Sequence, residues 1–158
     1  MEAPSEFVAV DHVTITVRDI EAARHFYADL LGLRVLTDVT LEGAGTFGGF
    51  AIQDGRIVEL ATSSGGAVYD STHTNRRHII FERIGGVSLS LNSHPGDDLA
   101  GEPAEKLDRL GYTHLAFEVR DLDAFVGRMR SLGVEPVAPG FFRDPEGNLV
   151  QVQEKAPT

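Results

Sequence analysis

The chain has 158 residues, 42% of them hydrophobic, and a formal net charge of −10 at pH 7. This length and composition indicate a single globular domain with a sizeable core. The negative charge, with no run of Lys or Arg to offset it, argues against nucleic acids and acidic membrane surfaces as partners. Because there is no cysteine, disulfides, thiolate metal sites and thiol nucleophiles are excluded.

Targeting signals are not evident. The first residues, MEAPSEF, lack the positive and apolar regions of a signal peptide. No segment reaches the roughly 18 consecutive apolar residues that a membrane-spanning helix needs. We therefore expect a cytoplasmic protein.

The sequence repeats itself. DHVTITVRDIEAARHFYADLLGLRVL (11–36) returns as THLAFEVRDLDAFVGRMRSLGVEPV (113–137). His12 aligns with His114 at an offset of 114 − 12 = 102, and Val-Arg-Asp follows in both copies. Such repetition indicates one supersecondary unit that was copied and packs against its copy. We expect two modules with a shared site marked by the two histidines.

The first copy predicts a strand, a helix and a second strand. Residues 12–17 alternate between polar and apolar, the period of a half-buried strand, with His12 on the more polar face. Asp19 is a suitable N-cap for a helix that ends at Gly32. The next strand is expected over residues 33–41.

The second copy follows the same logic. A strand from His114 leads to a helix that starts after Asp121 and ends at Gly133. Residues 144–148, Asp-Pro-Glu-Gly-Asn, supply turn chemistry between strands expected over 141–143 and 149–153. With a further strand before them, this module has the order β-α-β-β-β.

Two hairpin-like stretches compete to complete the first module. One spans residues 50–62 and turns at Asp54-Gly55, and the other spans 78–92 and turns at Gly85-Gly86. The first would leave roughly fifty residues before His114, which is long for a connection within a compact domain. We therefore favour the second hairpin.

The resulting organisation is one domain over residues 1–158. Module one covers about residues 7–93 and carries an extra segment at about 43–77. A linker follows at about 94–111, and module two covers about 112–155.

These residues resemble the vicinal oxygen chelate superfamily, which includes glyoxalase I, extradiol dioxygenases, epimerases and the bleomycin and fosfomycin resistance proteins. The resemblance rests on VRD[IL][ED]A leading into each helix, FYADLLGLRV in the first copy and FFRDPEGNLVQVQE in the second. It implies an α+β fold of two βαβββ modules whose mixed sheets curl around one cavity, with the helices outside. It also implies a homodimer, because modules in this superfamily often pair across chains.

The resemblance further implies a divalent metal, Fe, Mn, Ni or Zn, held by the first and last strand of each module. Carried over by position, the ligands are His12, His114 and Gln151, where the family usually has Glu. Gln offers only a neutral amide oxygen and cannot accept a proton from a substrate.

The fourth position depends on the open choice of hairpin. If residues 56–60 form the last strand of module one, Glu59 aligns with the family carboxylate and is a candidate ligand or catalytic base. If residues 87–92 form it, the polar face offers only Ser88, Ser90 and Asn92. Such a site lacks a carboxylate and would hold a metal poorly, so the protein would work without one.

Candidate substrate-binding residues are Ser88, Ser90, Gln153 and Arg77. Arg77 belongs to a cluster of two His and two Arg at residues 72–78 in an otherwise acidic chain. Such a cluster is able to form a flap that binds an anionic or enolate ligand. A solvated loop that balances nearby acids is the alternative.

Three hypotheses for function follow. The first is an enzyme in which a metal chelates two vicinal oxygens of a small substrate, with lyase, isomerase or dioxygenase outcomes. The second is a metal-free binding protein that resembles the bleomycin resistance proteins. The third is a subunit or interaction protein, suggested by the acidic surface and the extra middle segment; a well-enclosed cavity would argue against it.

Overall fold

The structure is a computed structural model that describes residues 9–41, 50–53, 56–59, 76–94 and 99–156. Module one contains β1 (His12–Thr16), α1 (Ile20–Arg24), η1 (His25–Leu30), β2 (Val35–Leu41), β3 (Phe50–Gln53), β4 (Arg56–Glu59), β5 (Arg76–Phe81) and β6 (Ser88–Ser93). Module two contains β7 (His114–Val119), α2 (Leu122–Ser131), β8 (Phe141–Arg143) and β9 (Leu149–Glu154).

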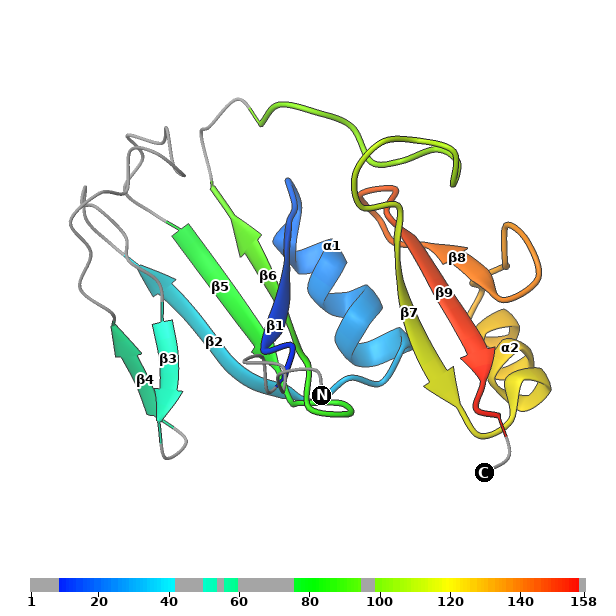
Figure 1. Ribbon diagram of the computed structural model, residues 1–158, viewed down its shortest axis with the longest axis horizontal. Helices are drawn as coiled ribbons and strands as arrows, with labels where there is room; N and C mark the ends of the chain where they lie inside the picture. Colours follow the sequence, from blue (N-terminus) through cyan, green and yellow to red (C-terminus); the bar gives the residue numbers. More distant parts are fainter. Residues whose placement is uncertain (1–8, 42–49, 54–55, 60–75, 95–98, 157–158) are drawn as a thin grey trace, which may run out of the picture.

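Module one is built on a four-stranded mixed sheet in the order β1-β6-β5-β2 (Figure 1). The first strand, β1, pairs in parallel with the last strand, β6. Strands β3 and β4 form a separate hairpin. The preferred hairpin, residues 78–92, therefore completes the module, whereas β3 and β4, from the competing stretch 50–62, are the extra element.

Module two repeats this arrangement with three strands in the order β7-β9-β8. Its first and last strands, β7 and β9, again pair in parallel. The strand expected before β8 is reduced to a single bridge between Ala138 and Phe141. Pro136 and Pro139 flank this segment and have no N–H to donate, which explains why a regular ladder does not form there.

The helices begin where the sequence predicts. Asp19 accepts a hydrogen bond from the N–H of Ala22, and Asp121 accepts one from Ala124, so both aspartates cap their helices. After α1 the helix continues as the wider η1, and Gly32 and Gly133 follow the two helical segments with positive φ angles of 89° and 81°. Within the described residues, no helix is long and apolar enough to cross a membrane.

The apolar core lies on the helix side of both sheets and is continuous between the modules. In module one, buried Phe81 and Leu91 pack with Ala23 and Tyr27 of the helix. In module two, Met129 packs with the other buried members, Phe142, Val150 and Val152.

A buried polar contact joins the modules within this core. The hydroxyl of Tyr27 donates to a carboxylate oxygen of Asp144 at 2.8 Å, although the two residues are 117 positions apart. Asp144 also accepts from the backbone N–H and the side-chain amide of Asn148, at 2.8 and 2.9 Å. Burial, with Asp144 adjacent, raises the pKa of Tyr27 well above its ordinary value, so the hydroxyl remains a donor.

Two arginines reinforce the contact from the surface. Arg18, just after β1, is paired with Glu146 in the turn between β8 and β9, whose carboxylate also accepts from the Arg18 backbone N–H at 2.8 Å. Arg128 of α2 donates to the carbonyl of Leu30 at the end of η1, at 2.6 Å. The contacts of the 144–148 turn, together with the one from Arg128, thus hold the modules in one orientation.

We expect Tyr27→Phe to destabilise the protein by about 1–3 kcal/mol, because the buried carboxylate of Asp144 loses a donor and regains no water. Chemical denaturation at neutral pH measures this loss. Tyr112→Phe is the matched control, since Tyr112 is fully exposed and its hydroxyl is hydrated in the folded chain. Equal stability of the two variants would contradict the assigned role of Tyr27.

Candidate functional site

The strand registers decide which residues stand beside the two histidines. In module one, His12 lies opposite Ser88, Thr14 opposite Ser90 and Thr16 opposite Asn92. Side chains alternate along a strand, so this set shares the face of the sheet that is opposite the helix. That face is therefore lined with hydroxyl and amide groups.

Module two gives the equivalent positions. His114 lies opposite Leu149, and Gln151 follows two residues later on the same face, opposite Ala116 and Phe141. Because Ser88 and Leu149 occupy the same place beside their histidines, Ser90 is the counterpart of Gln151. The two positions from which family members are expected to supply carboxylates hold a hydroxyl and an amide.

Glu59 does not occupy either position. It lies in β4, where its backbone pairs with Phe50 of β3 in the separate two-stranded sheet. The alignment that would place Glu59 next to β1 requires β4 as the last strand of the module, and that place belongs to β6. Residues 56–59 therefore match the expected motif in sequence only.

The imidazole of His12 is held by its neighbour. Nδ1 lies 2.8 Å from a carboxylate oxygen of Asp11 and donates to it, since a carboxylate only accepts. Asp11 is also paired with Arg83, and these two contacts, Arg83 first, lower the pKa of Asp11. More than half of the His12 side chain (57%) is exposed. Nδ1 is therefore engaged, so any ligation by His12 would use Nε2.

His114 has a similar environment. Its Nδ1 lies 2.9 Å from the hydroxyl of Thr113, again the preceding residue. The ring meets that of Phe141 edge to face, with centroids 5.6 Å apart and an interplanar angle of 68°. His114 is exposed on the surface of one chain.

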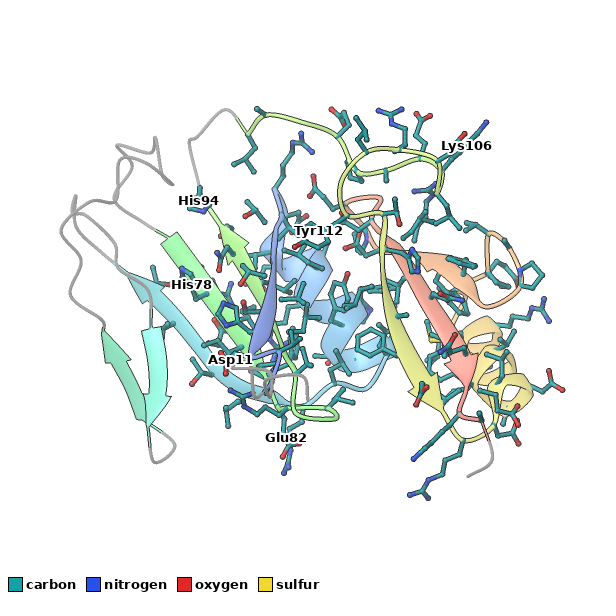
Figure 2. The ribbon with its side chains drawn as sticks, viewed as in Figure 1. Asp11, His78, Glu82, His94, Lys106 and Tyr112 are labelled. Atoms are coloured by element: carbon teal, nitrogen blue, oxygen red, sulfur yellow. The ribbon has the colours of Figure 1, made fainter. Side chains whose placement is uncertain are left out.

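The two histidines begin strands that run in opposite directions. Strands β1 and β6 run upward in Figure 1, whereas β7 and β9 run downward. Figure 2 accordingly shows Asp11, which precedes His12, at the lower end and Tyr112, just before His114, in the upper half. We call the two sets of residues half-sites, His12 with Ser90 in module one and His114 with Gln151 in module two. That the two meet in one site within the chain stays a prediction.

The serines of β6 are buried and bonded inside module one. The hydroxyl of Ser90 lies 2.7 Å from that of Thr14, and the hydroxyl of Ser88 donates to the carbonyl of Phe81 at 2.6 Å. Gln153, the other proposed substrate contact, is exposed near the end of β9. The binding roles of these residues remain predictions.

The partners of the Arg77 side chain differ from those expected of a ligand-binding flap. Its guanidinium forms two hydrogen bonds of 2.7 Å with the carboxylate of Asp38 and also pairs with Glu21 of α1. This pairing lowers the pKa of Asp38. Arg77 thus stabilises the helix side of the sheet and does not extend over the polar face as a flap. The other residues of that predicted flap, 72–75, lie outside the described ranges.

The donor set does not fit the metal that the family resemblance implies. Iron, manganese, nickel and zinc sites of this kind combine imidazoles with at least one carboxylate. The two half-sites offer imidazole with hydroxyl and imidazole with amide. Among the described residues, no group of three or more His, Cys, Asp or Glu is placed to hold a metal ion.

A model of the Glyoxalase/Bleomycin resistance protein/Dioxygenase superfamily matches residues 9–152. The chain belongs to this superfamily. A lactoylglutathione lyase from Pseudomonas aeruginosa is 27% identical over 159 aligned positions, which cover 96% of this chain and 85% of the relative.

Solved structures of superfamily members share the fold. A glyoxalase family protein from Bacillus cereus has a TM-score of 0.71 at 19% identity, covering 99% of this chain and 100% of that one. A glyoxalase/dioxygenase from Nostoc punctiforme has a TM-score of 0.63 at 22% identity, covering 99% and 97%. These similarities confirm the α+β fold of paired modules.

Sequence reasoning missed two features of the site. His78, expected in the flap and at the start of the 78–92 hairpin but not as a site residue, is buried in β5 opposite Asn92, which adds an imidazole to the polar face. Residues 76–81, Arg-Arg-His-Ile-Ile-Phe, do not alternate between polar and apolar, so the sequence carried no signal for the face of His78. Asp144 was assigned to turn chemistry alone, and no local pattern indicates its distant partner Tyr27.

Restoring the missing carboxylates should create metal affinity. We expect the double variant Ser90→Glu, Gln151→Glu to bind Ni²⁺ or Zn²⁺ measurably, whereas the parent chain does not, because two carboxylates then join the two imidazoles. Elemental analysis after loading and dialysis measures the bound metal.

Adding His114→Ala to the double variant is the control and should remove the gained metal. The single variant Gln151→Glu, at a partly exposed position, tests one half-site without a buried change at Ser90. A double variant that folds and binds no more metal than the parent would show that these positions do not form a ligand set.

Proposed function

We propose that this protein binds a small molecule without a metal ion, as the bleomycin resistance proteins do, and that it is not a metal-dependent lyase. The observation that supports this proposal is the pairing of β1 with β6, which puts Ser88, Ser90 and Asn92 beside the first strand. Hydroxyl and amide groups hold a ligand by hydrogen bonds, but they neither polarise a carbonyl strongly nor accept a proton from carbon.

A homodimer is part of the proposal. His12 and Ser90 form one half-site and His114 and Gln151 the other, on strands that run in opposite directions. Two copies related by a two-fold axis would place module one of each against module two of its partner. Each complete site would then have two parts. One copy would supply the polar wall, Ser88, Ser90 and Asn92 of β6, and the other copy would supply the His114–Phe141 pair.

The ligand that suits such a site is small, neutral and partly aromatic. The polar wall supplies hydrogen bonds without a net charge, and the edge-to-face pair of His114 and Phe141 offers a surface for a ring. Apolar surface with a few oriented polar groups is the usual composition of small-molecule sites.

Metal-dependent lyase or isomerase activity is the second candidate. It is favoured by the two equivalent histidines whose Nδ1 atoms are held at 2.8 and 2.9 Å by the preceding residue, an arrangement that suits ligation through Nε2. The related lactoylglutathione lyase names a reaction to test.

Two measurements distinguish the candidates. With glutathione and methylglyoxal, we expect no formation of S-lactoylglutathione above the protein-free rate, with Ni²⁺, Zn²⁺, Mn²⁺ or Fe²⁺ supplied in turn. With benzamide as a neutral aromatic probe, we expect saturable NMR shifts at β6 and β9 that EDTA leaves unchanged.

Metal-dependent turnover that His114→Ala abolishes in a folded protein would contradict the binding function. So would an absence of any benzamide shift on the two strands. Thr40→Ala, in β2 on the helix side of the sheet, is a control that should change neither result.

A further inference from the structure

Asn92 differs from the other polar residues of its face. It is buried, with 4% of its surface exposed, and its side-chain oxygen has no hydrogen-bond partner among the residues that the structure describes. An unbonded polar atom in the interior costs free energy, so a native one indicates a missing partner. The neighbouring serines already have hydrogen-bond partners: Ser90 is bonded to Thr14, and Ser88 donates to the carbonyl of Phe81.

The surroundings of Asn92 limit what that partner is. Across the sheet, Thr16 lies opposite Asn92 on β1 and His78 lies opposite it on β5, so the three form one polar row. Figure 2 shows His78 on the sheet of module one. A carboxamide oxygen accepts and never donates, so the partner must bring an N–H or O–H group. No carboxylate or guanidinium belongs to this row, which favours a neutral partner.

We propose that Asn92 is the specificity-determining residue of the polar wall and that it accepts a hydrogen bond from an N–H or O–H group of a neutral bound ligand. This inference rests on the proposed binding function. It adds that ligands with a donor at this point are selected over otherwise identical ligands without one. A site with a buried acceptor rejects a molecule that leaves the acceptor unpaired.

The stability of the free protein provides the first test. Asn92→Leu keeps the approximate size of the side chain and removes the unbonded oxygen, so the ligand-free variant should be as stable as the parent or more stable. If Asn92 served only the fold, for instance by bonding a structural water, the same change would lower the midpoint of unfolding and overturn the proposal.

Ligand selectivity provides the second test. Benzamide has two N–H donors and N,N-dimethylbenzamide has none, while both keep the ring and the carbonyl. We expect the parent protein to prefer benzamide by about tenfold, the effect of one buried hydrogen bond. Asn92→Leu should bind the two equally, as followed by NMR titration. Asn92→Ala, which removes the amide without filling its space, should lose the same preference.

Ser93→Ala is the matched control. Ser93 is the next residue of β6 but faces the helix side, and its buried hydroxyl also lacks a partner among the described residues. This variant should keep the preference for benzamide. Selectivity that survives in Asn92→Leu would overturn the inference while leaving the binding function intact. If benzamide does not bind at all, both proposals fail.

Discussion

The parallel pairing of the first and last strand determines the chemistry of each module. A parallel neighbour cannot follow a strand through a tight hairpin, so the intervening helix and strands must cross over before the chain returns beside its start. The strand that occupies the place beside the first strand supplies the residues next to the histidine. In module one the strand is β6, and it contributes serines and an asparagine. In module two it is β9, and it contributes Gln151 and Gln153.

The relation between the modules determines how many sites there are. Strands β1 and β7 run in opposite directions. The buried hydrogen bond between Tyr27 and Asp144, together with the pairing of Arg18 and Glu146, holds this orientation. Both histidines are exposed in this arrangement, as the proposed pairing of half-sites across two chains requires.

The sequence predicted the local structure well. The alternation after His12 and His114, the aspartate caps and the glycine stops all follow from short-range physics, and the strands and helices lie where these signals put them. Loop length was sufficient to choose between the hairpins. Pro136 and Pro139 were the available signal that the strand expected before β8 would not form a regular ladder.

The site was harder to predict because it depends on contacts between distant residues. Repetition shows that His12 and His114 are equivalent, but equivalence alone does not place them in one site. Glu59 matched the expected motif, yet the register of β6 excludes it from the place beside β1. Arg77 suited an anion-binding flap by composition, whereas Asp38 and Glu21 hold it on the other face.

The central claim is that the residues beside His12 and His114 do not form a metal site. Its most direct test is an anomalous-scattering map from crystals of the unmodified protein soaked separately in Ni²⁺ and Zn²⁺. The account predicts no metal peak within ligand distance of Ser90 or Gln151. An ordered peak bound by His12 of one copy and by His114 of another, or by Glu59, would contradict it.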